Sequence, residues 1–245
     1  MEPREVVVND AQANSIGLKV AQNEGVRNRL DQLSWPDDAR FSSFGIAHLP
    51  WYPQAENNSA LSFNGFLLYW SKSQALPDWL IEVYYPPWNS KEDYLSTKHD
   101  VFQRKLSYFL QDNISAQTQY LIANLEARLP KMLQEVKNPF ARMHVYENFY
   151  HVSMQQNGVY ALLDYYVFKG EGISPEERYN NQGWGLLQVL ENMQGSSDDL
   201  IDAFVSSADV ILTRRIVNAP SNEKKQLVAW RKRVQTYGEL STRSD

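Results

Sequence analysis

The chain has no cysteine among its 245 residues, which excludes disulfide bonds and thiolate metal sites. Its four histidines, His48, His99, His144 and His151, are not spaced as in His-Glu-x-x-His or similar zinc motifs. The sequence also lacks a phosphate-binding glycine loop, a nucleophile elbow and a dinucleotide fingerprint. We therefore expect neither a metal ion nor an organic cofactor.

Long apolar runs are absent as well. A helix that spans a bilayer needs roughly 18 consecutive apolar residues, and no run in the sequence approaches that length. The N-terminus, whose apolar run is only Val6-Val7-Val8, does not resemble a signal peptide. We expect no membrane span and no signal peptide in the given chain.

A strong excess of positive charge is missing too. The 24 basic and 29 acidic residues are interspersed and give a formal net charge of −5. Proteins that bind nucleic acids usually carry a basic patch or stripe, and none is visible in this sequence. Nucleic acid is therefore not an expected partner.

The chain is rich in residues that build a core, because 43% are hydrophobic and 13% are aromatic. The hydrophobic spacing is mainly helical, and a glycine-containing hairpin is predicted over 41–48. We expect a single, predominantly helical α+β domain over 1–245, in which the aromatic- and proline-rich segment 50–90 is an insertion or a cleft wall. Helices are predicted over 11–23, 59–71, 97–110, 115–136, 139–154, 158–169, 184–193, 197–214 and 222–235.

Acidic and hydroxyl groups follow the first predicted helix. Glu24 stands at its end, Asp37 lies in the next polar stretch, and Ser43 opens the segment Ser-Phe-Gly-Ile-Ala-His. Cleavage of a glycosidic bond needs one acid to protonate the leaving oxygen and a second group to hold the attacking water. A carboxyl group that a hairpin partly shields from water can remain a proton donor near neutral pH. The stretch therefore indicates a glycan hydrolase.

The same residues resemble the phage-type lysozymes, glycoside hydrolase family 24. That family has a Glu-Gly, an Asp, five residues, and then a Thr-Ile-Gly-Tyr/Ile-Gly-His segment, and five residues also separate Asp37 from Ser43. Farther along, the apolar run from Ala161 to Gly170 is similar to the family's helix ending in Phe-Asn-x-Gly. The segment Arg214 to Pro220 resembles its Arg-Trp-x-x-x-x-Pro.

The resemblance implies a lysozyme-like fold, with a small β-hairpin lobe and a larger helical lobe. It implies a muramidase that cleaves the β-1,4 bond between N-acetylmuramic acid and N-acetylglucosamine in peptidoglycan. Glu24 would be the general acid, Asp37 would position water and Ser43 would assist it. Gly45 and His48 would support the hairpin, and Arg231 or Arg233 would pair with Glu24. Peptidoglycan strands would be the partner, and we expect a monomer that acts in the periplasm or outside the cell.

The sequence departs from the family pattern at three points. Twelve residues separate Glu24 from Asp37, which is a longer gap than in the simple phage enzymes, so Asp31 or Asp38 could replace Asp37. Serine stands in place of threonine at position 43, and Ala47 replaces the second hairpin glycine. A non-catalytic wall-binding protein of the same fold therefore remains an alternative.

A second constellation resembles goose-type lysozymes and lytic transglycosylases. Glu171 follows an apolar helix, and Gly185-Leu-Leu-Gln188 lies close behind it, as a Gly-Leu-Met-Gln motif follows the single catalytic Glu of those enzymes. In this alternative, Glu171 is the catalytic acid and Gln188 contacts the substrate. Trp51 and Tyr52, directly after the hairpin, are the aromatic residues best placed to stack on sugar rings.

Overall fold

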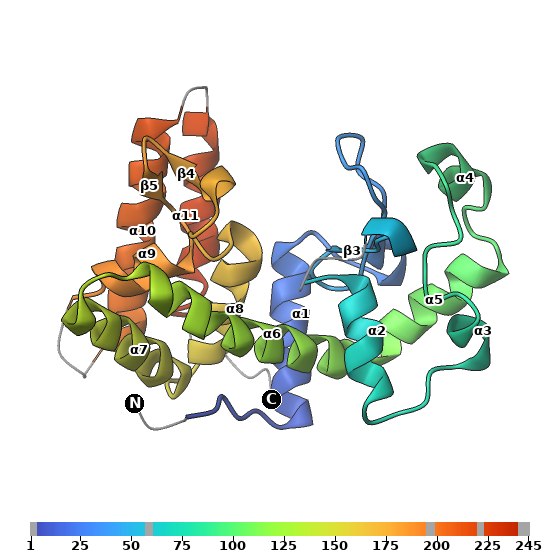
Figure 1. Cartoon of the computed structure of the whole chain (residues 1–245), viewed down its shortest axis with the longest axis horizontal. Helices are drawn as coiled ribbons and strands as arrows, with labels where there is room; N and C mark the ends of the chain where they lie inside the picture. The colour runs from blue at the N-terminus through green and yellow to red at the C-terminus, as the bar shows by residue number, and fades with distance from the viewer. Residues whose placement is uncertain (1–3, 57–60, 195–198, 220–222, 240–245) are drawn as a thin grey trace. The chain divides into compact units, whose positions relative to one another are not determined.

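The structure, a computed structural model, describes residues 4–56, 61–194, 199–219 and 223–239. The fold is predominantly helical and contains two small antiparallel sheets, which confirms the mostly helical α+β class (Figure 1). The chain divides into two compact units, an N-terminal unit of residues 8–124 and a C-terminal unit of residues 125–245 with 1–7. A single lysozyme-like domain over 1–245 stays a prediction. Within the described ranges, no helix is both long enough and apolar enough to cross a membrane.

Short polar residues begin most helices of the N-terminal unit. Asn9 and Gln12 form a capping box at the start of the first helix, since the side chain of each accepts a hydrogen bond of 2.9 Å from the backbone N–H of the other. Side chains of Ser62, Ser90 and Asp100 cap later helices in the same way. The helices of this unit are α1 (Asp10–Asn23), α2 (Phe63–Ser71), α3 (Asp78–Ile81), α4 (Lys91–Ser96), α5 (Val101–Asp112) and the first part of α6 (Ile114–Glu135).

A small sheet follows α1. Strands β1 (Leu33–Ser34), β2 (Ser43–Phe44) and β3 (Leu49–Pro50) pair antiparallel in chain order. Ser43 lies opposite Ser34 on one side and opposite Pro50 on the other. The expected hairpin is therefore present, and β1 adds a third strand to it.

Aromatic side chains fill the core of the N-terminal unit. Trp51 is fully buried, with its ring centroid 5.3 Å from that of Phe44 and 5.0 Å from that of Phe63. Trp88 stacks on Phe44 and is also buried. Segment 50–90, expected as an insertion or cleft wall, thus supplies much of this core.

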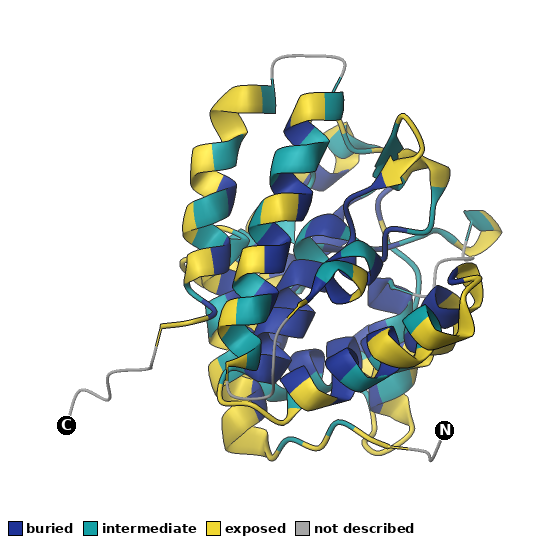
Figure 2. Cartoon of the chain, turned by 90° about the vertical axis from the view of Figure 1, so that its left-hand side faces the viewer, coloured by how far each residue is buried: buried dark blue, intermediate teal, exposed yellow. Residues whose placement is uncertain are grey.

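The C-terminal unit is organised around one buried helix. Every residue of α8 (Gly158–Lys169) from Gly158 to Tyr166 is buried, as expected for a helix that is apolar on all sides. Figure 2 shows the surrounding helices with their buried residues turned inward and their exposed residues outward. The other helices are α7 (Pro139–Ser153), α9 (Leu186–Asn192), α10 (Leu200–Asn218) and α11 (Leu227–Gln235).

A two-stranded hairpin of β4 (Arg178–Tyr179) and β5 (Gln182–Gly183) packs against α10 (Figure 1). Its turn residues, Asn180 and Asn181, both have positive φ, at 51° and 62°. Two consecutive positive φ values are typical of the type I′ turn that suits the twist of a tight hairpin, and asparagine tolerates them well.

The observed helices differ from the predicted ones mainly in the residues at which they begin and end. The predictions for α7 and α8 are confirmed to within one residue, whereas α10 continues to Asn218 rather than ending at Arg214. The helix predicted over 222–235 begins at Leu227, after a 3₁₀ turn at Glu223–Gln226. Positions 59, 60, 197, 198, 220 and 222, on which other predictions fall, lie outside the described residues.

Candidate functional site

Glu24 terminates α1 and is partly exposed. Gly25 follows with φ of 81°, and its N–H donates to the Gln22 carbonyl oxygen at 3.1 Å. The Val26 N–H donates to the Ala21 carbonyl oxygen at 2.8 Å. These two bonds form a Schellman motif, in which glycine adopts the left-handed conformation that ends a helix. The sequence therefore fixes Glu24 at the last position before the chain turns.

The hairpin between β2 and β3 contacts this helix end. Nε2 of His48 donates to the backbone carbonyl oxygen of Glu24 at 3.3 Å. His48 itself has a positive φ of 47°, so it closes the turn in a conformation that few non-glycine residues adopt. His48 therefore contacts the end of α1, and its expected role in supporting the hairpin stays a prediction.

Gln117 of α6 anchors the other side of the hairpin. Its Oε1 accepts a hydrogen bond from the Ile46 N–H at 3.0 Å, and its Nε2 donates to the Leu110 carbonyl oxygen at 2.7 Å. Gly45 has φ of 82°, and a Cβ at this position would overlap the Gln117 oxygen. Position 45 therefore needs glycine both for its conformation and for the close approach of Gln117.

Ser43 lies on β2 and is only 7% exposed. Its Oγ is buried and has no hydrogen-bond partner among the described residues. Most buried hydroxyl groups are hydrogen-bonded, so an unpartnered one is a candidate to hold a water molecule.

Asp37, the residue expected to position water, lies on the surface of the N-terminal unit. Its side chain is fully exposed on the loop between β1 and β2 and forms an ion pair with Lys91 of α4. The hydrogen bond from Lys91 and the positive charge of Lys91 lower the pKa of Asp37 below its ordinary value. Asp37 is therefore an ionised surface carboxylate.

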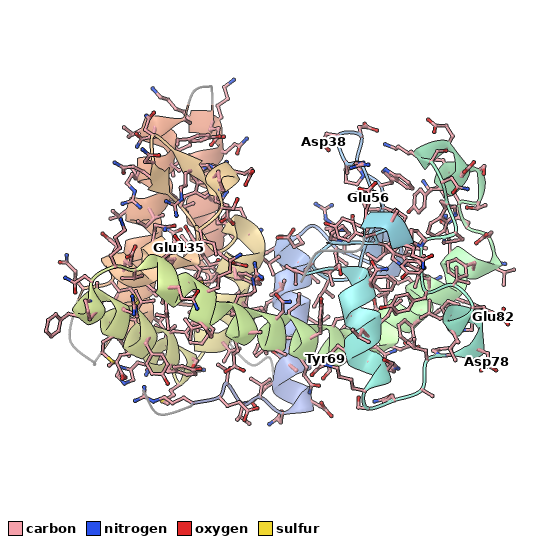
Figure 3. The ribbon with its side chains drawn as sticks, in the orientation of Figure 1. Asp38, Glu56, Tyr69, Asp78, Glu82 and Glu135 are labelled. Atoms are coloured by element: carbon pink, nitrogen blue, oxygen red, sulfur yellow. The ribbon has the colours of Figure 1, made fainter. Side chains whose placement is uncertain are left out.

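Asp31 and Asp38, the two carboxylates that could replace Asp37, lie in different places in the N-terminal unit. Oδ2 of Asp31 accepts hydrogen bonds from the backbone N–H groups of Arg27 and Asn28, at 2.8 and 3.0 Å, and so caps a short 3₁₀ turn. Asp38 lies at the tip of the loop between β1 and β2 (Figure 3). Asp31 lines a hollow of about 490 Å³ together with Gly25 and His48, whereas Asp37 does not, so the alternative that Asp31 replaces Asp37 stays open.

The two aromatic candidates differ from each other. Trp51 is fully buried and its Nε1 donates to the Tyr84 carbonyl oxygen at 3.0 Å, so the prediction that it stacks on sugar is wrong in this conformation. Its packing against core rings leaves neither face of the indole available. Tyr52 is partly exposed, with its ring edge-to-face against Phe41 at 5.1 Å, and its role as a stacking residue stays a prediction.

Glu171 and Gln188 make contacts that hold the C-terminal unit together. Glu171 is 8% exposed and its Oε1 accepts a hydrogen bond from Nε of Arg128, which raises the pKa of that arginine. Oε1 of Gln188 accepts from the Gly185 N–H at 3.0 Å, and its Nε2 donates to the Gly172 carbonyl oxygen at 3.0 Å. Both side chains thus fix the chain after α8.

Glu177 is a residue that the sequence interpretation missed. Its carboxylate accepts hydrogen bonds from four consecutive backbone N–H groups, those of Glu171, Gly172, Ile173 and Ser174, at 2.9–3.1 Å. Ser174-Pro-Glu-Glu177 has the form of a capping box, which was the available sequence signal. Glu177 therefore orders the turn that contains Glu171.

The C-terminal arginines also have partners within their own unit. Arg231 binds Asp209 on α10 at 2.5 Å, and Arg233 binds the fully buried Asp164 at 2.8 and 2.9 Å. The expected pairing of Arg231 or Arg233 with Glu24 stays a prediction.

Two further observations concern metal binding and similarity to known proteins. Within the described part of the chain, no group of three or more His, Cys, Asp or Glu side chains could hold a metal ion. No family model matches the chain, and neither a curated protein nor a solved structure matches it.

Proposed function

We propose that the protein is a muramidase that hydrolyses the β-1,4 bond between N-acetylmuramic acid and N-acetylglucosamine in peptidoglycan. The observation that carries this proposal is the 3.3 Å contact between His48 Nε2 and the Glu24 carbonyl oxygen. This contact holds a helix-terminal carboxylic acid beside a hairpin that carries the unpartnered hydroxyl of Ser43. The order of helix end, loop carboxylate and hairpin hydroxyl is also the order in the phage-type lysozymes that the sequence resembles.

In the proposed reaction, Glu24 donates its proton to the glycosidic oxygen as the bond to the anomeric carbon breaks. Water attacks that carbon and passes a proton to a carboxylate, for which Asp37 is the candidate because an exposed aspartate beside Lys91 is ionised near neutral pH. The Ser43 hydroxyl accepts a hydrogen bond from the attacking water. The substrate would place this activity in the periplasm or outside the cell.

The stereochemical outcome depends on the distance between the two carboxyl groups in the complex. A separation of about 6.5–9.5 Å leaves room for water and leads to inversion, whereas about 5 Å leads to retention through a covalent intermediate. Proton NMR of the first product formed distinguishes the two anomers.

The transglycosylase alternative has less support. Arg128 binds the Glu171 carboxylate, and the Gln188 amide is engaged by Gly172 and Gly185. Oε2 of Glu171 is buried and has no partner among the described residues, so one oxygen of this carboxylate is not engaged. The same digestion experiment tests this alternative, because transglycosylases release anhydro products.

The test is digestion of purified peptidoglycan by wild type, Glu24→Gln, Glu171→Gln and Glu82→Gln, followed by mass spectrometry of the fragments. Glu82 is an exposed residue at the end of α3 and serves as the matched control (Figure 3). Loss of a general acid should reduce the rate by about 10²–10⁴-fold in Glu24→Gln alone. Anhydro products that disappear with Glu171→Gln would contradict the proposal, as would no release by well-folded wild type.

A further inference from the structure

A groove on the C-terminal unit gathers charged residues that the proposed reaction does not use. It is a hollow of about 660 Å³ between the end of α6, the β4–β5 hairpin, α9 and α10. A second hollow of about 470 Å³ adjoins it and shares Glu135, Arg178 and Asn181. Figure 3 shows Glu135 at the C-terminal end of α6. The volumes are in the range of sites that bind small molecules or a few residues of a peptide.

Five charged side chains line the larger hollow, namely Arg178, Arg214, Lys137, Glu135 and Glu191. None of them forms an ion pair with another described residue. By contrast, four other arginines of this unit form ion pairs with acidic residues: Arg128–Glu171, Arg215–Glu223, Arg231–Asp209 and Arg233–Asp164. The groove therefore concentrates charged side chains that form no ion pair, whereas other arginines of the same unit do form ion pairs.

The two arginines are held in place by the backbone. Nη2 of Arg178 donates to the Gly172 carbonyl oxygen at 3.2 Å, and Nη2 of Arg214 donates to the Gly183 carbonyl oxygen at 2.9 Å. Nε of each guanidinium is buried and has no acceptor among the described residues. A guanidinium has five donors in a planar fork that matches a carboxylate, so both arginines retain capacity for an anionic ligand.

The two carboxylates of the groove restrict the kind of anion. Burial raises the pKa of Glu191, while the positive charges of Arg214 and Arg178 act in the opposite direction, so these three groups lie within electrostatic reach of one another. Glu135 and Glu191 would repel a polyanion, whereas they could bind a ligand ammonium group. The set of three cations and two carboxylates is complementary to a ligand that carries both carboxylate and amino groups.

We propose that this groove binds the stem peptide of peptidoglycan, with Arg178, Arg214 and Lys137 on its carboxylates and Glu135 and Glu191 on the free amino group of its diamino acid. The choice of this peptide rests on the proposed function, since a stem peptide projects from each N-acetylmuramic acid. The groove would then distinguish peptide-substituted strands from bare glycan.

The experiment is isothermal titration of the full chain with the soluble tripeptide L-alanyl-γ-D-glutamyl-meso-diaminopimelate. Saturable binding to wild type is expected, with a dissociation constant at least tenfold higher for Arg214→Gln and severalfold higher for Lys137→Gln. Lys131→Gln is the matched control, because Lys131 is an exposed lysine on α6, shortly before Lys137 in the chain, and does not line the groove. A tripeptide whose carboxyl groups are amidated should bind wild type more weakly than the parent tripeptide does. Arg214→Gln should weaken the binding of the amidated tripeptide less than it weakens the binding of the parent tripeptide.

Lys137 is exposed, so its substitution tests the groove even if Arg214→Gln is poorly folded. No saturable binding by folded wild type, or affinities within twofold of wild type for both variants, would overturn the proposal. Glu24→Gln should bind the tripeptide as wild type does. If wild type cleaves peptidoglycan but does not bind the tripeptide, only the proposal about the groove is refuted. If wild type binds the tripeptide but does not cleave peptidoglycan, only the proposed muramidase activity is refuted.

Discussion

Asp164 on α8 is fully buried, and both of its carboxylate oxygens accept hydrogen bonds from Arg233 on α11, at 2.8 and 2.9 Å. The Tyr237 hydroxyl donates to the same carboxylate at 2.6 Å. Taking a carboxylate out of water is costly unless its charge and lone pairs are satisfied, and this geometry satisfies them. The pair therefore links the central helix of the C-terminal unit to its last helix.

Arg233→Met should lower the free energy of unfolding by about 3–5 kcal/mol, because it leaves the Asp164 charge buried without its cation. Urea denaturation followed by circular dichroism measures the change. Lys232→Met is the control, since Lys232 is the exposed neighbour on α11, and it should change stability by less than about 0.5 kcal/mol. Equal effects of the two variants would show that the buried pair does not stabilise the fold.

Two glycines with nearly the same backbone conformation separate the effect of φ from that of packing. Gly25 and Gly45 have φ of 81° and 82°, but a Cβ at 25 meets no atom within 4 Å, whereas a Cβ at 45 overlaps Gln117. Gly25→Ala should cost about 1–2 kcal/mol from its left-handed conformation alone. Gly45→Ala should cost about 1–3 kcal/mol more, because Gln117 or the hairpin must move.

Thermal and urea unfolding of the two glycine variants measure the difference. If Gly45→Ala and Gly25→Ala are equally destabilised, the hairpin is not held by Gln117 as described. If the hairpin positions Ser43, Gly45→Ala should also lose more peptidoglycan hydrolysis than Gly25→Ala at a temperature where both are folded.

Some elements could be predicted from the sequence because their signals are local. Helix α8 is a mostly apolar stretch between Asn157 and Gly170, so its ends and its burial follow from the sequence, although the buried Asp164 within it does not. The end of α1 at Glu24 likewise follows from Gly25. The β4–β5 hairpin was missed, since its strands have two residues each and its turn is Asn180-Asn181 rather than the stronger Asn-Gly signal.

The candidate site was harder to predict because its properties depend on residues far apart in the chain. Trp51 follows the hairpin directly, but Phe63 and Trp88 enclose it, and local sequence does not show that. The exposure of Asp37 depends on the course of its loop and on Lys91, 54 residues away. Arg178 and Arg214 are brought to one groove only by the packing of the β4–β5 hairpin on α10.

The ion pair of Asp37 gives a prediction about pH. Lys91 lowers the pKa of Asp37 in the folded protein, so the pair contributes stability above the ordinary pKa of an aspartate, about 3.9, and loses it as the pH falls through the lowered value. Carbon-13 NMR titration should show the Asp37 pKa below that value in wild type and closer to it in Lys91→Met. The shift should shrink at high salt, since the carboxylate is exposed.

Lys72→Met is the matched control for this titration, because Lys72 is an exposed lysine of the same unit at the end of α2. The Asp37 pKa should be the same in Lys72→Met and wild type. An Asp37 titration that Lys91→Met leaves unchanged would show that the pair does not persist in solution.

Ser42 and Ser43 test whether the hairpin hydroxyl takes part in the reaction. Both Oγ atoms are buried without a partner among the described residues, so removing either one breaks no hydrogen bond of the folded protein. Ser42→Ala and Ser43→Ala should therefore leave the free energy of unfolding within about 0.5 kcal/mol of wild type. If Ser43 orients the attacking water, Ser43→Ala alone should slow peptidoglycan hydrolysis by about threefold to tenfold, the value of one hydrogen bond. Equal rates for the two variants would remove Ser43 from the mechanism, because Ser42, directly before β2, is a buried serine that has no role in the proposed reaction.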